Sequence, residues 1–315
     1  MKIFLTGCSG FIGYHLTKSL LDKGFFVFGV DNLNNYYDRN LKIDRLKILQ
    51  NEENFNFIKK DINELDSINL ECDIAINLAA QPGVRLNKEE YYKYDHSNID
   101  GFKIFLNFCK RNKIPRVVYA SSSSVYSGNK KIPYSEGDKI LNPTSRYAET
   151  KLVNENLAEQ ITQKEKMKAV GLRFFTVYGP FGRPDMAYYF FTKNILENKE
   201  IPIFNNGNTY RDMTYIDDII NGINLSLNFV KKQKTNHEIF NLGNNKPIET
   251  LSLIKYIENE FSAKAKIKNI FAKDEVHKTF ANIEKAQSIL GYNPKINFEA
   301  GIKFFFDWYR HYYKL

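Results

Sequence analysis

The stretch that decides the fold lies at the N-terminus and reads Lys2-Ile-Phe-Leu-Thr-Gly-Cys-Ser-Gly-Phe-Ile-Gly13. Its first part, Lys2–Thr6, is a short apolar run typical of a buried strand. Apolar residues then recur every four positions, at Ile12, Leu16 and Leu20, which is the spacing of a helix. A strand that passes into a helix through a glycine-rich turn predicts the first unit of a parallel sheet.

Three glycines, Gly7, Gly10 and Gly13, lie in this turn. In a dinucleotide-binding loop the first glycine permits a tight turn, the second lets the backbone approach a pyrophosphate, and the third lets the helix pack on the strand. The helix start, with Phe11 and Ile12, would face the diphosphate with free N–H groups and a partial positive charge. A plain turn is the alternative, but the flanking strand and helix favour a dinucleotide site.

Asp31 ends the second predicted strand, 18 residues after Gly13. A carboxylate at this place accepts hydrogen bonds from both hydroxyls of the adenosine ribose and repels a 2′-phosphate. The next residue is Asn32 rather than an arginine, which favours NAD over NADP. After the third strand, the polar–apolar pair Asp61-Ile62 is predicted to hold the adenine, with a simple loop carboxylate as the alternative reading of Asp61.

Strands and helices alternate along the first half of the chain. The predicted strands are Phe25–Val30, a segment around Phe55 and Phe57, Asp73–Leu78, Arg116–Ser121 and Val170–Phe174, and the longest predicted helices run from about 89 to 113 and from about 143 to 163. This alternation predicts an α/β fold with a Rossmann-type, doubly wound parallel sheet.

The second half of the chain has aromatic clusters, loops and shorter helices, predicted at 187–198, 217–232, 251–261 and 283–290. A strand at 238–242 is expected to return to the main sheet. We therefore predict a NAD-binding domain of residues 1–175 plus about 214–243, interleaved with a smaller C-terminal substrate domain of residues 176–213 and 244–315.

The composition is that of an ordinary globular protein, with 43% hydrophobic and 26% charged residues among 315. It excludes wholesale disorder and collagen-like repeats. The net charge of +9 comes from lysines spread along the chain, which indicates a solvated surface and leaves room for an anionic substrate. No stripe of alternating basic and aromatic residues is visible, so no nucleic-acid partner is expected.

Three cysteines without a C-x-x-C pair are typical of reduced, buried thiols, and no metal site is expected. The apolar stretch before Cys8 is too short for a signal sequence, and no apolar run reaches the roughly 18 residues of a membrane span. We expect a cytoplasmic protein with no membrane partner.

Tyr147 and Lys151 stand one turn apart on one face of a predicted helix. A nearby ammonium lowers the pKa of a tyrosine from about 10 toward working pH, so the phenolate can act as a base. The same spacing recurs at Tyr14/Lys18, Tyr126/Lys130 and Tyr189/Lys193. Only Tyr147 begins a long helix downstream of a serine-rich strand end, Ala120-Ser-Ser-Ser-Ser-Val-Tyr126, where ligands bind in such sheets.

Together with Asn77-Leu-Ala-Ala80, these motifs resemble the extended short-chain dehydrogenase/reductase family along nearly the whole chain. Four longer strings resemble its UDP-glucuronate 4-epimerase branch more specifically. They are Asp31–Asp38, Gly171–Gly179, Gly182–Ala187 and Arg211–Asp218.

The resemblance implies an NAD-dependent isomerase, a 4-epimerase of a UDP-sugar that converts UDP-glucuronate to UDP-galacturonate. Tyr147 would take the proton of the sugar 4-hydroxyl while C4 gives hydride to the nicotinamide. The 4-keto sugar would then turn over, and hydride would return to its other face. The resemblance also implies a homodimer formed through the two long helices, and polysaccharide biosynthesis is a plausible role.

The same resemblance assigns the site residues. Lys151 would bind the nicotinamide ribose and polarise Tyr147, while Ser122 would share the substrate proton, with Ser123 and Ser124 as alternatives. Arg211 would hold the UDP diphosphate, and Arg183 would pair with the C6 carboxylate, with a surface arginine in a loop rich in glycine and proline as the alternative reading. Leu78, Ala79, Ala80 and Asn98 are expected beside the cofactor, and Arg85 and Thr176 beside the substrate.

The absence of acidic residues at one position of the site limits the reactions that we expect. Related dehydratases and decarboxylases carry acidic residues where this chain has Ser123-Ser124, so loss of water or of carbon dioxide is disfavoured. A 4-keto uronic acid readily loses carbon dioxide, and we expect Arg183 and the serines to hold its carboxylate out of the cleavage geometry. The alternatives are a 4-epimerase of neutral UDP-hexoses, namely UDP-glucose or UDP-N-acetylglucosamine, and a non-catalytic NAD-binding protein, which would not need Tyr147, Lys151 and the serines together.

Overall fold

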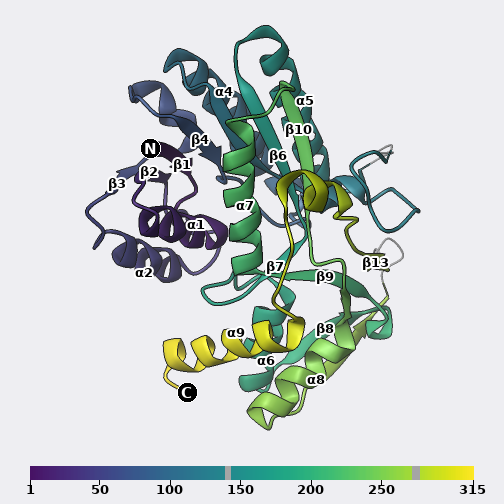
Figure 1. The fold of residues 1–315 in the computed structure, drawn as a ribbon. Helices are drawn as coiled ribbons and strands as arrows, with labels where there is room; N and C mark the ends of the chain where they lie inside the picture. The colour runs from purple at the N-terminus through teal and green to yellow at the C-terminus, as the bar shows by residue number, and fades with distance from the viewer. Residues whose placement is uncertain (139–142, 272–276) are drawn as a thin grey trace.

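The computed structural model describes residues 1–138, 143–271 and 277–315. Figure 1 shows two parts, a large sheet flanked by helices and a smaller group of short strands and helices at the bottom of the view. The chain passes between the two parts several times, so neither part is one continuous segment.

Seven parallel strands form the main sheet in the order β10-β6-β5-β4-β1-β2-β3. Their bounds are Lys2–Thr6 (β1), Phe26–Asp31 (β2), Phe55–Lys59 (β3), Ile74–Asn77 (β4), Arg116–Ser122 (β5), Lys168–Phe174 (β6) and His237–Leu242 (β10). The strand order reverses between β1 and β4, which is where ligands bind in doubly wound sheets. The predicted fold class is confirmed, and the strand predicted at 238–242 lies in the main sheet.

Helices cover both faces of this sheet. Helices α1 (Phe11–Asp22), α2 (Arg39–Leu49) and α7 (Ile216–Val230) lie on one face, and α4 (Gly101–Arg111) and α5 (Arg146–Lys164) on the other. Side chains of β1 alternate between the two layers, since Ile3 and Leu5 belong to one buried cluster and Phe4 to the other. A strand buried on both faces reads as the continuous apolar run seen in the sequence.

The smaller part is built around β9 (Tyr210–Tyr215). This strand pairs antiparallel with β11 (Pro247–Glu249) and parallel with β7 (Thr176–Tyr178) and β13 (Lys278–Thr279), while β8 (Glu200–Phe204) pairs parallel with β12 (Lys266–Ile270). Its helices are α6 (Ala187–Leu196), α8 (Thr250–Phe261), α9 (Phe298–Tyr313) and the short helical segment Ala286–Leu290. Because β7 follows β6 after one residue, this part sits directly at the carboxyl edge of the main sheet.

The structure differs from the sequence-based expectation in three of its helical segments. The helix predicted from about 89 to 113 is continuous from 92 to 111 but changes type, since a π-helical segment (Asp95–Asp100) lies between α3 (Tyr92–Tyr94) and α4. Helices α2 and α9 lie where no helix is predicted. In α2 the buried face includes Lys42 and Arg45, so its apolar pattern is broken. Short 3₁₀ turns complete the fold at Ile62–Ser67, Lys88–Glu90, Ser123–Tyr126 and Asn205–Gly207.

Candidate functional site

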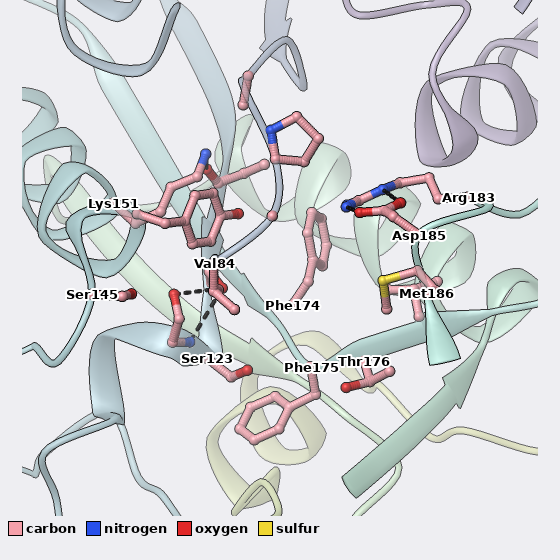
Figure 2. A pocket seen from close by; sticks show the side chains of 18 of the residues that line it. Val84, Ser123, Ser145, Lys151, Phe174, Phe175, Thr176, Arg183, Asp185 and Met186 are labelled. Atoms are coloured by element: carbon pink, nitrogen blue, oxygen red, sulfur yellow. Dashed lines mark hydrogen bonds and ion pairs between the residues drawn. The ribbon is translucent and has the colours of Figure 1, made fainter. Parts of the chain in front are cut away.

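A cavity of about 980 Å³ opens at the carboxyl ends of the main-sheet strands and extends to the smaller part of the molecule. Its volume suits a cofactor together with a substrate. The predicted residues that line it are Phe11, Ile12, Gly13, Leu78, Ala80, Arg85, Ser122, Ser123, Ser124, Tyr147, Lys151, Thr176, Arg183 and Arg211. Figure 2 shows Lys151 on one side of this cavity and Arg183 with Asp185 on the opposite side.

The glycine loop has the geometry that an anion requires. Gly7 has a φ of +77°, and a Cβ on Gly13 would lie 1.9 Å from the Gly7 carbonyl oxygen, so neither position tolerates another residue. Helix α1 begins at Phe11, and among the described residues no side chain caps its N-terminus. Its first N–H groups therefore face the cavity as an anion-binding end.

Asp31 lies at the end of β2 with its carboxylate held by the backbone. Its Oδ2 accepts a hydrogen bond from Ser9 N at 3.1 Å and its Oδ1 from Leu33 N at 2.8 Å. Burial raises the pKa of Asp31, while the charge of Lys42 opposes the rise. Asp31 is not among the residues that line the cavity, although it stands beside the loop that does.

Asn32 and Asp61 are joined, since Asn32 Nδ2 donates to Asp61 Oδ2 at 2.7 Å. Asp61 also caps the 3₁₀ turn Ile62–Ser67 by accepting from Asn63 N. Although burial raises it, hydrogen bonds from Asn63 and Asn32 hold the pKa of Asp61 below its usual range. The next residue, Ile62, is packed in the core, where its side chain contacts Gly101. Both predicted adenine contacts thus have a clear structural role of their own.

Asn98 lies within the π-helical segment and is almost fully buried. Its Oδ1 accepts from Gln81 N at 2.7 Å, and its Nδ2 donates to Gln81 O and to Thr150 Oγ1. Asn98 therefore fixes the turn after β4 and does not itself line the cavity. Within that turn Leu78 and Ala80 face the cavity, whereas Ala79 N is directed to Thr6 Oγ1 at 3.4 Å.

Helix α5 brings Tyr147 and Lys151 to one wall. Ser145 caps the helix by accepting from Ala148 N at 3.2 Å, which places Tyr147 in the first turn. The Lys151 amine lies 5.8 Å from the centre of the Tyr147 ring and donates to Ala120 O at 2.9 Å. A phenol and an ammonium are thus held together at the end of β5.

The ionisation of this pair follows from its burial. Burial raises the pKa of Tyr147, while the charge of Arg183 and a hydrogen bond with Ser122 oppose the rise. Burial lowers the pKa of Lys151 to about 8, against the attraction of Glu155. The expected lowering of the Tyr147 pKa by Lys151 is therefore wrong for the cofactor-free protein, because burial outweighs the nearby positive charge, and the charge that opposes the rise is that of Arg183.

Replacing Lys151 with methionine should stabilise the cofactor-free protein at pH 7. The fall of its pKa from 10.5 to about 8 corresponds to a cost of about 3 kcal/mol for the charged amine. Losing its bond to Ala120 offsets about 1 kcal/mol, which leaves a gain of about 2 kcal/mol.

The gain in stability of Lys151→Met over the wild type depends on pH. Below pH 8 the amine is charged in the folded and the unfolded state, so the cost is fully present. Between about pH 8 and 10.5 the folded protein releases the proton and the unfolded chain keeps it, so wild-type stability rises and the gain of the variant shrinks. Urea unfolding at pH 7 and pH 10 measures this, and a variant less stable at both values would contradict the reasoning.

The serine cluster continues from β5 into the 3₁₀ turn Ser123–Tyr126. Ser122 Oγ accepts a hydrogen bond from Ser124 N at 3.2 Å and from Ser124 Oγ at 2.9 Å. Its hydroxyl is oriented by these donors and also bonds Tyr147. Ser122 is therefore the serine of the cluster that is joined to the phenol, while Ser123 and Ser124 line the same wall.

Three arginines line the cavity on the substrate side. Arg183 makes a side-on pair with Asp185, with Nε to Oδ1 at 3.0 Å and Nη2 to Oδ2 at 2.5 Å. The Arg85 guanidinium lies 4.2 Å from the centre of the Phe204 ring, and Arg211 Nη1 donates to Tyr210 O at 2.9 Å. This side of the cavity is suited to anionic groups of a ligand.

Three further residues near this site were not predicted from the sequence. Tyr36 and Asp185 line the cavity, and Tyr36 OH donates to Asp185 Oδ2 at 3.2 Å. Arg45 is fully buried in α2, where it bonds Ser9 O, Tyr37 OH and the carbonyls of Phe181 and Gly182. Arg45 thus ties the glycine loop to the loop that leads to Arg183. The sequence signal for Arg45 is weak, because Lys42 and Arg45 interrupt the apolar pattern of the buried face of α2.

A buried polar network lies behind Lys151. Arg173 pairs side-on with Glu155, with Nε to Oε1 at 2.8 Å and Nη2 to Oε2 at 2.7 Å. Arg173 Nη1 also donates to Tyr126 OH at 2.6 Å, and Ser121 Oγ donates to Glu155 Oε1. The network anchors α5 to the ends of β5 and β6, and so supports the wall that carries Tyr147.

The described residues hold no group of three or more His, Cys, Asp and Glu side chains placed to bind a metal ion. Cys8, Cys72 and Cys109 are free thiols. None of the helices in the described ranges combines the length and the apolarity that crossing a membrane requires.

The fold and the site define a nucleotide-dependent enzyme of the extended dehydrogenase type. Residues 3–243 match the model of the NAD dependent epimerase/dehydratase family, and the chain belongs to this family. It is 47% identical to an uncharacterized protein of Methanocaldococcus jannaschii, over 98% of this chain and 96% of that one. It is 42% identical to UDP-glucuronate 4-epimerase 4 of Arabidopsis thaliana, over 99% of this chain and 76% of that one.

Among solved structures, the chain is similar to the UDP-glucuronic acid 4-epimerase of Bacillus cereus in complex with UDP-glucuronic acid and NAD. The TM-score is 0.91 at 34% identity, and the match covers 99% of this chain and 100% of that one. The expected dependence on NAD is confirmed by the family and by this neighbour.

Proposed function

We propose that this protein is an NAD-dependent 4-epimerase that interconverts UDP-glucuronate and UDP-galacturonate. One observation carries the proposal: a single cavity holds the Tyr147–Lys151–Ser122 group on one wall and Arg183 on the opposite wall. The first group suits oxidation of an alcohol, and the second suits a carboxylate on the same sugar. The named relatives in Arabidopsis thaliana and Bacillus cereus support this substrate.

The residues present fit NAD. The tight glycine turn leads into the N-terminus of α1, whose first N–H groups can bind a diphosphate, and the Asp31 carboxylate beside this loop can accept from ribose hydroxyls. Asp31 also disfavours a 2′-phosphate. Bound NAD would accept hydride from C4 of the sugar and later return it.

In the proposed reaction, Tyr147 takes the proton of the 4-hydroxyl, and Ser122 shares the hydrogen bond to that oxygen. Lys151 contributes positive charge beside the phenol and is held by the Ala120 carbonyl. Because Tyr147 receives the proton when the ketone forms, it can return the proton after the sugar has turned over. One phenol thus serves both directions of the epimerisation.

The uronate carboxylate requires protection, because the 4-keto intermediate is a β-keto acid. Arg183 lies across the cavity from Lys151 and presents a guanidinium suited to a carboxylate. Ser123 and Ser124 offer hydroxyls but no carboxylic acid that could assist elimination. We propose that Arg183 and the serines keep the carboxylate out of the geometry in which carbon dioxide leaves.

The test is incubation of the purified protein with UDP-glucuronate, without added reductant, followed by chromatography with mass detection. A new peak of unchanged mass that co-elutes with UDP-galacturonate supports the proposal. A product lighter by the mass of carbon dioxide would move the assignment to a decarboxylase. Turnover of UDP-glucose or UDP-N-acetylglucosamine alone would favour the neutral-sugar alternative, and no turnover of any of them would favour a non-catalytic NAD-binding protein.

Arg183→Ala is expected to reduce kcat/KM for UDP-glucuronate by about 10–100-fold, the value of one charged hydrogen bond. The share of decarboxylated product should rise, because the carboxylate is no longer held. Product analysis by chromatography with mass detection measures both. Arg111→Ala is the matched control, since Arg111 pairs with Asp66 away from the cavity. Normal epimerisation by Arg183→Ala would show that this residue does not hold the carboxylate.

We further propose that the protein is a cytoplasmic homodimer that serves polysaccharide biosynthesis. Helices α4 and α5 carry the partly exposed apolar side chains Ile104, Leu157 and Ile161, which support a helical interface. Size-exclusion chromatography with light scattering tests the dimer.

A further inference from the structure

Asp185 forms an ion pair with Arg183 in the wall of the cavity. It accepts from Arg183 through the Nε–Nη2 edge of the guanidinium, and its Oδ2 also accepts from Tyr36 OH at 3.2 Å. Tyr36 is itself confined, since its hydroxyl lies 2.4 Å from where a Cβ on Gly83 would stand. The carboxylate of Asp185 is thus held from two sides, at the edge of the cavity.

The pairing leaves part of the guanidinium for a ligand. An arginine has five N–H donors in a planar fork, and Asp185 uses only one edge. Arg183 Nη1 makes no hydrogen bond to any described residue, and it is not fully buried. It is therefore open to the cavity that Arg183 lines. A second carboxylate can therefore bind at the end of the fork while Asp185 remains in place.

The pair also sets the charge that a ligand meets. Arg183 lies within electrostatic reach of Lys42 and of Tyr147. Since Asp185 neutralises the charge of Arg183, the hydrogen bonds of the guanidinium contribute more to holding a ligand carboxylate than its net charge does. A sugar that must turn over within the cavity needs a contact that can be released.

We propose that Asp185, anchored by Tyr36, is a positioning residue that presents the free edge of Arg183 to the uronate carboxylate. Through this contact Asp185 determines the ratio of epimerised to decarboxylated product. The inference rests on the proposed function, because it takes a uronate as the substrate. It requires that Asp185 acts through Arg183 and not independently of it.

Asp185→Asn tests this directly. The variant should lower kcat for UDP-glucuronate by about 10-fold, because a misoriented guanidinium no longer holds the carboxylate in place. KM for UDP-glucuronate should fall, since a negative charge near the ligand is removed, and the decarboxylated share should rise. A merely structural role would leave the product ratio unchanged. Tyr36→Phe should act in the same direction with a smaller effect.

A double-mutant cycle provides the decisive comparison. In an Arg183→Ala background, Asp185→Asn should have no further effect on kcat or on the product ratio, because its target is gone. If the two substitutions changed kcat by independent factors that multiply in the double variant, the inference would be wrong. Asp66→Asn is the matched control, as Asp66 pairs with Arg111 outside the cavity. If Asp185→Asn does not fold, the cycle of Tyr36→Phe with Arg183→Ala gives the same decision.

The Kd for UDP-glucuronate and for UDP-glucose is also determined for each variant of the double-mutant cycle. This second result does not depend on turnover. If the wild type turns over only UDP-glucose, the proposed function fails. If Asp185→Asn changes binding of UDP-glucuronate by the same factor with and without Arg183, the inference fails by itself. A change that appears only when Arg183 is present, and only with UDP-glucuronate, supports it.

Discussion

Replacing Tyr147 with phenylalanine should reduce kcat for epimerisation by about 10²–10⁴-fold, the usual value of a positioned proton-transfer group. The ring would keep its place in the first turn of α5, so only the hydroxyl joined to Ser122 is lost. Chromatography of the products from UDP-glucuronate measures the effect. Binding of NAD, followed by fluorescence titration with NADH, should change little, because the glycine loop and Asp31 remain intact.

Tyr92→Phe is the matched control, because Tyr92 is 64% exposed and does not line the cavity. This control should retain full activity. If Tyr147→Phe kept more than about a tenth of the wild-type rate, well above the expected range, the proton would have to leave through another group. Tyr36, which also lines the cavity, would then be the first residue to replace.

Replacing Arg173 with methionine should lower the free energy of unfolding by about 3–5 kcal/mol, because it leaves a buried carboxylate without its partner. Arg173 and Glu155 are only 4% and 5% exposed, and Arg173 also bonds Tyr126 OH. Urea denaturation followed by circular dichroism measures the loss.

Glu155→Gln added to Arg173→Met should restore much of this stability, since the uncompensated charge is removed. Lys110→Met is the matched control: Lys110 pairs with Glu165 at the surface, and its loss should cost only about 0–1 kcal/mol. A loss of under 1 kcal/mol in Arg173→Met itself would mean that Glu155 is protonated or hydrated in the folded protein.

The main sheet was predictable because its signals are local. The glycine loop, the apolar strand runs and the helical spacing after Gly13 each lie within a few residues. The Tyr147–Lys151 pair was predictable for the same reason, since one helical turn brings the two side chains together. Helix α2 was missed because its buried face carries Lys42 and Arg45, which no apolar pattern includes.

The contacts of Asp185 were not predictable, because they join distant parts of the chain. Tyr36 and Asp185 are separated by 149 residues, and nothing in either local stretch indicates the other. Asn98, which the sequence predicts beside the cofactor, supports the turn after β4 through its bonds to Gln81, and these contacts were not predictable either. Its position depends on the π-helical segment, which shifts the side-chain directions expected of a regular helix.

The contacts of Arg45 have a consequence for the affinities of the cofactor and the sugar. Its guanidinium joins the carbonyl of Ser9 to those of Phe181 and Gly182, so it ties the glycine loop to the approach to Arg183. A dinucleotide that restrains the first loop also restrains the second. The affinities for cofactor and sugar are therefore expected to be thermodynamically linked, and each ligand should raise the affinity for the other by the same factor.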